Sequence, residues 1–150
     1  MIQEHYYDVS VDWEEGRKGT MTSAVLDKAI EVATPPQFAQ GIEGVWSPEH
    51  LFVAAVNSCL MTTFLAIAEN SKLVYSGFTS KAMGKLEMVD GKFIMSEVTL
   101  LPTVVVPYEE DQERAMRILK KSEAACLISN SIKSKIILEP TVKIASLVNL

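Results

Sequence analysis

The sequence contains few residues that bind metals through sulfur or nitrogen. Its 150 residues include two cysteines, Cys59 and Cys126, and two histidines, His5 and His50. Zinc motifs place their ligands in closely spaced pairs, whereas these four residues are scattered, so we expect no metal site. The chain also lacks a CxxC pair. The sequence by itself therefore does not show whether the two cysteines meet.

Positive charge is scarce as well. Fourteen Lys and Arg residues stand against 19 Asp and Glu residues, which gives a formal net charge of −5 and a pI near 5.1. No run of basic residues is longer than two. Proteins that bind nucleic acids normally present a basic face to the phosphates, so we expect no nucleic-acid partner.

The first residues, MIQEHYYDVSVDW, lack the apolar core and the cleavage pattern of a signal peptide. We therefore expect a cytoplasmic protein. In a reducing compartment a permanent disulfide between Cys59 and Cys126 is disfavoured. These cysteines then carry either transient redox chemistry or no chemistry.

The composition is typical of a globular protein, because 48% of the chain is hydrophobic and 22% is charged. The length fits one domain spanning residues 1–150. The hydrophobic patterns predict an α+β fold in the order β-β-β-α-β-β-α-β. The expected strands are 3–13, 20–26, 29–33, 78–89, 92–106 and 133–148, and the expected helices are 47–70 and 107–126.

Local signals support several of these elements. A turn over residues 14–19 separates the first two strands, and Asp90-Gly91 predicts a tight hairpin. Pro102 predicts an edge strand or a bulge, since proline cannot donate to a sheet ladder. The second helix should bury one face and continue into a short helical turn around CLISNSI. The inner face that we expect consists of Ala115, Ile118, Leu119 and Ser122.

The first helix has a clear beginning, with Ser47 as N-cap, Pro48 in the first turn and Glu49 at the positive end of the dipole. It is apolar around nearly its whole circumference, as in a central core helix or a membrane span. Polar residues at its middle and the lack of basic flanks argue against a membrane span. A core helix of this kind needs cover on all sides, which an intertwined homodimer would supply.

From the residues alone, Cys59 is most simply a buried and inert thiol, because apolar surroundings raise a thiol pKa. To react it would need a nearby cation and a polar opening. Arg17 is by default a solvated charge in a turn, Glu49 a first-turn acid and His50 a surface or capping residue. These interpretations stay open at this point.

Four motifs resemble the OsmC/Ohr family, the osmotically inducible and organic hydroperoxide resistance proteins. WSPEHLFVAAVNSCLMTTFLAIAE resembles the family signature, in which a Pro-Glu pair opens a central helix and a cysteine follows ten positions after the Glu. EAACLISNSIK is similar to the second cysteine motif, WEEGRKGTMTS to the early arginine turn and VATPPQF to the loop before the helix. These matches run from Trp13 to Lys133, over nearly the whole chain.

The resemblance implies a thiol peroxidase folded as an intertwined homodimer with active sites at the subunit interface. Cys59 would be the peroxidatic cysteine and Cys126 the resolving one. Arg17, or the adjacent Lys18, would supply the cation that stabilises the Cys59 thiolate, and Glu49 would hold the guanidinium. A dithiol reductant, for which a lipoyl protein is one candidate, would reopen the disulfide. No metal, haem or flavin cofactor is implied.

An apolar wall would favour organic hydroperoxides over hydrogen peroxide as substrate, in oxidative or osmotic stress defence. The residues that we expect to line it are Phe38, Trp46, Met61 and Phe64. The alternative is that these four side chains only pack in the core. The better-known branches usually carry a proline after the second cysteine, whereas this chain has Leu127, and AAVNS before Cys59 lacks their glycine. These departures indicate an OsmC-like subgroup. They keep open a noncatalytic protein that binds an apolar ligand, or a structural dimer with inert cysteines.

Overall fold

A computed structural model describes residues 3–145 of the chain. These residues fall into two compact units, one ending at Leu51 and the other beginning at Phe52. We describe each unit by itself. The expectation of a single domain over residues 1–150 stays a prediction.

The first unit contains an antiparallel sheet of three short strands, β1 (Ser10–Glu15), β2 (Lys18–Thr22) and β3 (Ile30–Ala33), in the order β1-β2-β3. Gly16 has a φ of +52°, and this left-handed conformation closes the β1–β2 hairpin within two residues. The turn that we expected over residues 14–19 is therefore too long. The first strand also begins later than the predicted residue 3, and the second ends before the predicted residue 26.

Helix α1 (Pro48–Asn70) begins and ends as the sequence predicts. The Ser47 hydroxyl accepts the His50 main-chain N–H at 3.1 Å and pairs with His50 Nδ1 at 2.6 Å, so Ser47 is a true N-cap. At the other end, Lys72 takes a left-handed φ of 56°. The Leu73 N–H there returns to the Ala68 carbonyl at 2.9 Å, which ends the helix.

The sheet of the second unit is built on the long hairpin of β4 (Gly77–Val89) and β5 (Lys92–Val106). Asp90 and Gly91 both have positive φ, 50° and 78°, which confirms the predicted tight turn. Two short strands, β6 (Lys135–Leu138) and β7 (Thr141–Ile144), pair in parallel with the other side of β5. The closing strand that we predicted as one segment is therefore split in two, and its last residues, 146–148, lie outside the described residues.

The expectation that Pro102 marks an edge strand or a bulge is wrong. Strand β5 is central, Pro102 pairs in register with Ser80, and the register shift of the β4–β5 hairpin lies at Lys85/Leu86 instead. Along β5, the pairing with β6 ends at Leu100 and the pairing with β7 begins at Thr103. Pro102 thus occupies the break between two partner strands, where its missing N–H costs no ladder bond.

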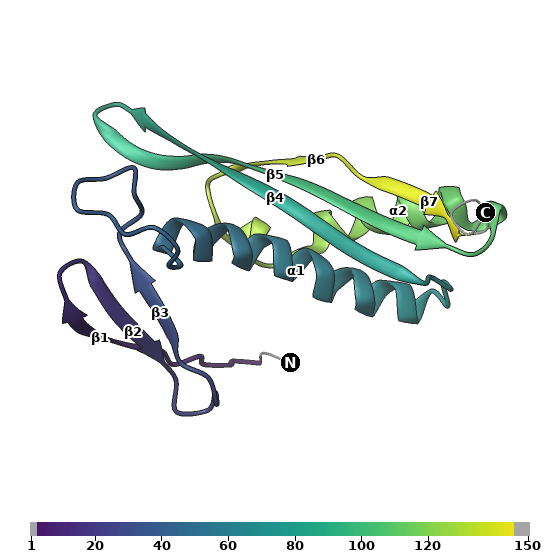
Figure 1. Cartoon of the computed structure of the whole chain (residues 1–150). Coiled ribbons are helices and arrows are strands. Elements are labelled where there is room, and N and C mark those ends of the chain that lie inside the picture. Colours follow the sequence, from purple (N-terminus) through teal and green to yellow (C-terminus); the bar gives the residue numbers. More distant parts are fainter. Residues whose placement is uncertain (1–2, 146–150) are drawn as a thin grey trace. The chain divides into compact units, whose positions relative to one another are not determined.

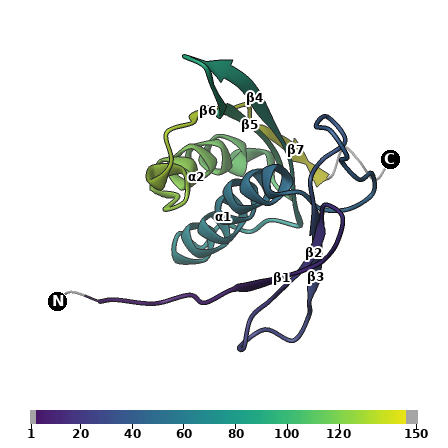
Figure 2. The ribbon, with the colours of Figure 1, turned by 90° about the vertical axis from the view of Figure 1, so that its left-hand side faces the viewer.

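Helices α1 and α2 (Gln112–Ala125) lie on the same face of this sheet (Figures 1 and 2). Short 3₁₀ turns, η1 (Glu109–Asp111) and η2 (Ser129–Ser131), precede and follow α2. The predicted inner face of α2 is confirmed residue by residue, and α1 contributes one buried stripe at a spacing of four. The buried stripe of α1 is Val56, Leu60, Phe64 and Ala68.

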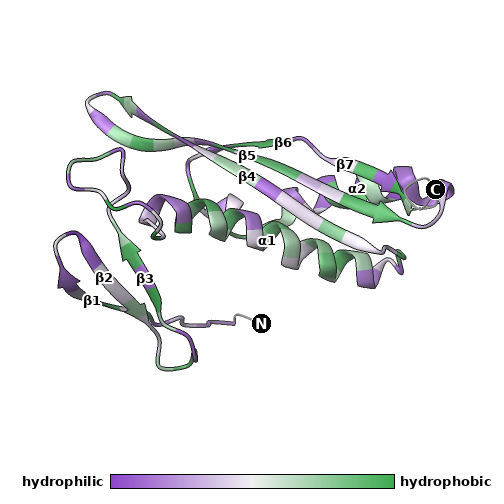
Figure 3. Cartoon of the chain, viewed as in Figure 1, coloured by the Kyte–Doolittle hydropathy of each residue, from purple (hydrophilic) through white to green (hydrophobic). Residues whose placement is uncertain are grey.

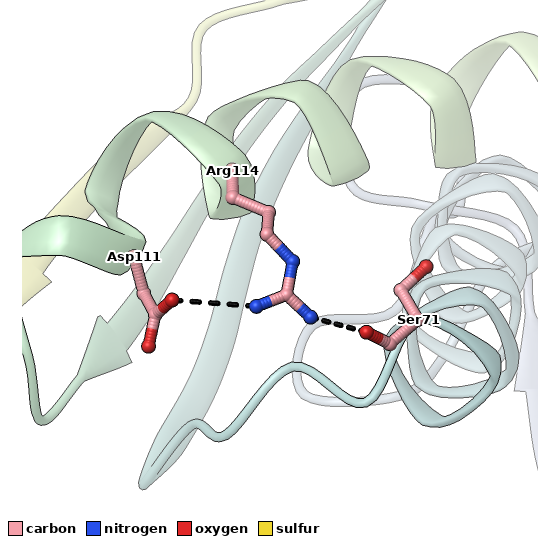
Figure 4. A network of polar contacts seen from close by, with 3 residues as sticks. All are labelled: Ser71, Asp111 and Arg114. Atoms are coloured by element: carbon pink, nitrogen blue, oxygen red, sulfur yellow. Dashed lines mark hydrogen bonds and ion pairs between the residues drawn. The ribbon is translucent and has the colours of Figure 1, made fainter.

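Arg114 links the start of α2 to the turn after α1. Its guanidinium lies 3.3 Å from the Asp111 carboxylate and also donates to the Ser71 main-chain carbonyl (Figure 4). A residue near the start of α2 therefore satisfies a carbonyl at the end of α1. This contact fixes the end of α1 against α2 within the second unit.

Helix α1 is mostly apolar between hydrophilic ends (Figure 3), and by length and composition it could cross a membrane, with a mean hydropathy of 2.0. The core helix of a globular protein can have the same length and mean hydropathy. Only 22% of that segment is buried in the chain, and Met61 and Leu65 on it are exposed.

The predicted α+β order is confirmed, with the last strand divided. The homodimer stays a prediction.

Candidate active site

The two cysteines meet in the second unit although they are far apart in the sequence. Cys59 lies in the middle of α1 and is half-buried, and Cys126 is buried at the C-terminal end of α2. Both are free thiols. A side-chain hydrogen bond between the two thiols lowers the pKa of Cys59 and raises the pKa of Cys126.

The end of α2 fixes Cys126 through its main chain. Cys126 is the C-cap, with extended dihedral angles of φ −65° and ψ 115°. Its N–H donates to the Glu123 carbonyl at 3.1 Å, and its own carbonyl accepts the Asn130 N–H at 3.0 Å. The Asn130 side chain also donates to the Ala124 carbonyl at 3.2 Å. The chain therefore turns sharply at Cys126 and holds the thiol in place.

The surroundings of Cys59 favour its thiolate. Burial raises the pKa of Cys59, but hydrogen bonds from the Cys126 thiol, the Ile128 amide, the Thr63 hydroxyl and the Leu127 amide outweigh burial and leave that pKa below its ordinary value. The Thr63 Oγ1 atom lies 3.9 Å from the Cys59 sulfur. The interpretation of Cys59 as a buried thiol with a raised pKa is therefore wrong, because half-burial leaves it among donors.

The surroundings of Cys126 have the opposite effect. Burial raises the pKa of Cys126, and the neighbouring Cys59 raises it further, while the hydroxyl and the amide of Ser129 oppose the rise without cancelling it. The Ser129 hydroxyl is buried and forms no well-aligned hydrogen bond within the described part of the chain. At a given pH, Cys59 therefore carries a larger fraction of thiolate than Cys126 and is the better nucleophile of the pair.

The other predicted site residues belong to the first unit. Arg17 follows the turn glycine, and its Nε donates to the Gln40 side-chain oxygen at 3.3 Å. Lys18 forms an ion pair with Glu31 at 2.8 Å, and this partner raises the pKa of Lys18. The Glu49 Oε1 atom is buried and has no hydrogen-bond partner among residues 3–145. Arg17 and Glu49 form no ion pair with each other within the described residues.

A cavity of about 380 Å³ lies in the first unit beside Arg17 and Lys18. Its lining is Val11, Trp13, Arg17, Lys18, Gly19, Val32, Ala33, Thr34 and Pro48. None of the four residues that we expected to line an apolar pocket is among them. Phe64 is a core residue and contacts Tyr75 and Phe78, whereas Trp46 and Met61 are exposed and Phe38 is half-buried.

The donors around the two sulfurs were not predicted from the sequence. Thr63 could have been found, because a residue four positions after Cys59 lies on the same helix face. The amides of Leu127 and Ile128 carry no sequence signal, since every residue except proline has such a donor.

The sequence also predicts that the chain has no metal site. Among the described residues, no group of three or more Cys, His, Asp or Glu side chains is placed to hold a metal ion.

Comparison with known proteins places this chain in a family. A model of the OsmC-like protein family matches residues 41–141, which include both cysteines. The uncharacterized protein YmaD of Bacillus subtilis is 26% identical over 143 residues, which are 92% of this chain and 93% of the relative.

Solved structures share the fold. An OsmC-like protein of unknown function from Vibrio cholerae is similar with a TM-score of 0.82 and 23% identity, over 91% of this chain and 99% of the other. An organic hydroperoxide resistance protein from Elizabethkingia anophelis is similar with a TM-score of 0.72 and 22% identity, over 95% and 99% of the two chains. The family match covers more than half of the sequence, so this chain belongs to the OsmC-like protein family.

Proposed function

We propose that this protein is a thiol-dependent peroxidase that reduces organic hydroperoxides with Cys59 as the peroxidatic and Cys126 as the resolving cysteine. The observation that carries this proposal is that two free thiols lie near enough for each to shift the pKa of the other, with Cys59 lowered and Cys126 raised. The hydroperoxide resistance of relatives such as the Elizabethkingia protein supports the choice of substrate class.

The proposed reaction balances over two steps. The Cys59 thiolate attacks the distal oxygen of the hydroperoxide, the O–O bond breaks, and the alkoxide takes a proton and leaves as an alcohol. Cys59 is then a sulfenic acid. The Cys126 sulfur attacks the Cys59 sulfur, an S–S bond forms, and the hydroxyl leaves with the Cys126 proton as water. A dithiol reductant, such as a lipoyl protein, returns two electrons by disulfide exchange.

From the family resemblance, we propose Arg17 as the cation that stabilises the Cys59 thiolate and Glu49 as the carboxylate that holds its guanidinium. Two observations support this role. The buried Glu49 Oε1 atom has no partner among the described residues, and the terminal nitrogens of Arg17 are not used in its bond to Gln40. Lys18 is the weaker candidate for the cation, because Glu31 already pairs with it. The proposed working form is a cytoplasmic homodimer in stress defence.

The test is a count of free thiols before and after one equivalent of cumene hydroperoxide. We expect the wild-type protein to lose both thiols and to gain a Cys59–Cys126 disulfide within one chain, identified by peptide mass. Cys126→Ser should stop at a Cys59 sulfenic acid that dimedone traps. Cys59→Ser is the control and should consume no hydroperoxide. If the wild-type thiols stay unchanged, the peroxidase proposal is wrong and a noncatalytic binding protein becomes the better interpretation.

A further inference from the structure

Asn57 lies in the middle of α1, two residues before Cys59, and binds strand β4 through both ends of its side-chain amide. Its Nδ2 donates to the Ser80 main-chain carbonyl at 2.9 Å, and its Oδ1 accepts the Ser80 hydroxyl at 2.6 Å. Both residues are half-buried, and both belong to the unit that contains the two cysteines. Two hydrogen bonds therefore join one side chain of α1 to one residue of β4.

The Ser80 carbonyl is available to Asn57 because it lies on the open edge of the sheet. Strand β4 is at one end of the strand order, and Ser80 pairs with Pro102 of β5. On the other side of β5, the Leu100 carbonyl accepts the Glu139 N–H. Main-chain groups of alternate residues point to the same side of a strand, so those of Pro102 also point away from β4. Ser80 and Pro102 are then a non-hydrogen-bonded pair, and the Ser80 carbonyl points away from β5.

Cys59 lies on nearly the opposite side of α1 from Asn57. At about 100° per residue, the two side chains are about 160° apart around the helix axis, measured the shorter way, and the buried Val56 and Leu60 lie between them. Helix α1 lies on the β4 side of the sheet, with α2 beside it (Figures 1 and 2). The turn after α2 packs, through Ile128, against the cluster that includes Val56 and Leu60. Asn57 and Cys59 thus flank one buried stripe.

The buried stripe alone does not fix the rotation of α1 about its axis. Its members recur at a spacing of four and are all apolar, and hydrophobic burial is non-directional. Hydrogen bonds weaken steeply when they are misaligned, and a single polar asparagine sets the register of packed helices in coiled coils for this reason. The two bonds of Asn57 therefore decide the direction in which Cys59 points.

We propose that Asn57 is a positioning residue for the thiol pair, because its two bonds to Ser80 set the rotation of α1 and so hold the Cys59 sulfur toward Cys126. This role rests on the proposed function in one respect, since the pairing of these thiols is the resolving step of that reaction. Asn57 acts through the helix and not through contact with a reacting atom. Without its bonds α1 can rotate, which lowers the effective concentration of the Cys126 thiol at Cys59.

The test measures the equilibrium between the Cys59–Cys126 disulfide and the two thiols in glutathione buffers. The intact protein is alkylated at equilibrium and analysed by mass spectrometry. Asn57→Ala removes both bonds, and its equilibrium constant for disulfide formation should fall about tenfold, the scale on which one or two net hydrogen bonds bias an arrangement. Ser80→Ala removes only the hydroxyl bond and should lower the constant about threefold.

Ser58→Ala is the matched control on the same helix. Ser58 is exposed, and its hydroxyl donates to the Ala55 carbonyl at 3.3 Å, so its loss leaves the contact with β4 intact. This variant should keep the wild-type equilibrium constant. A fall as large as that in Asn57→Ala would refute the proposal, because the constant would then report any polar change on α1.

A merely structural role of Asn57 gives a different result. Folding free energy that is lost equally from the reduced and the oxidised protein shifts no equilibrium between them. Equal falls in the two melting temperatures, with an unchanged equilibrium constant, would therefore refute the proposal. The double variant Asn57→Ala/Ser80→Ala should match Asn57→Ala, since the Ser80 hydroxyl has then already lost its partner. Additive effects would also overturn the role of this pair.

Ser80→Ala decides the matter if Asn57→Ala does not fold, and a wild-type equilibrium constant in that variant means that the proposal is wrong. The glutathione measurement uses no hydroperoxide, so it is independent of peroxidase activity. A wild-type protein that forms no Cys59–Cys126 disulfide in oxidised glutathione refutes the positioning role. One that forms this disulfide but consumes no hydroperoxide refutes the peroxidase alone.

Discussion

At the scale of single residues, the sequence gives the wrong direction for the pKa shift of Cys59. Mid-helix position and apolar neighbours predict an inert Cys59, yet the structure shows it half-buried and surrounded by donors. The reason is that two of these donors are main-chain amides from beyond the end of α2. Contacts of this kind arise only from the tertiary fold, so no sequence motif predicts them.

Thr63 is the donor that a single substitution can remove cleanly. Thr63→Val keeps the shape of the side chain but loses the hydroxyl that lies 3.9 Å from the Cys59 sulfur. Because that hydroxyl lowers the pKa of Cys59, the variant should have a higher pKa. At a pH below both midpoints it should then contain several-fold less thiolate, with a matching loss in the rates of alkylation and hydroperoxide reduction.

Thr62→Val is the matched control for this change. The Thr62 hydroxyl lies one residue away on the same helix but donates to the Cys59 carbonyl at 3.1 Å, not to the sulfur. Its removal should leave the alkylation profile of Cys59 unchanged. Equal shifts in the two variants would show that the profile reports a general change in α1 and not the lost donor. At a pH well above both midpoints, all three proteins should react at the same rate.

At the scale of elements, the features that could be predicted are those decided by neighbours in the sequence. Ser47 caps α1 and Asp90-Gly91 closes the long hairpin, because caps and tight turns depend on local chemistry. The position of Pro102 could not be predicted in the same way. It is acceptable in a central strand only because β6 ends and β7 begins beside it, and those partners come from more than 30 residues further along the chain.

Gly84 shows how closely α1 and β4 pack within the second unit. A Cβ atom at this position would lie 2.4 Å from Val53 Cγ2 and 2.6 Å from Met95 Cε, closer than carbon atoms can approach. Gly84→Ala should therefore lower the free energy of unfolding by about 1–3 kcal/mol, the usual cost of overpacking. Urea unfolding followed by circular dichroism measures this change.

Gly77→Ala is the control on the same strand, since a Cβ there would meet Val105 at an ordinary 3.6 Å. It should leave the stability nearly unchanged. Val53→Ala removes the less flexible of the two side chains that would clash with the new Cβ. The double variant Gly84→Ala/Val53→Ala should therefore lose less free energy of unfolding than the sum of the two single changes. Strict additivity would mean that Gly84 and Val53 do not share a packing contact.

At the scale of the whole molecule, the chain leaves a large amount of apolar surface uncovered. On α1, only one stripe is buried, while Met61 and Leu65 are 39% and 36% exposed. Monomeric proteins rarely expose large contiguous apolar patches. The sequence predicts such a helix to need cover on all sides, and the homodimer that we propose would provide that cover.

Leu65→Lys tests the homodimer directly. Light scattering should give the wild-type protein a mass of twice 16.6 kDa, and the charged variant should shift toward the monomer, because a lysine ammonium is costly to bury without a partner. Glu69→Lys, an exposed polar position one turn further along α1, controls for added positive charge and should stay dimeric. A monomeric wild-type protein would refute the dimer. It would leave the pairing of Cys59 and Cys126 unaffected, because both residues lie in one chain.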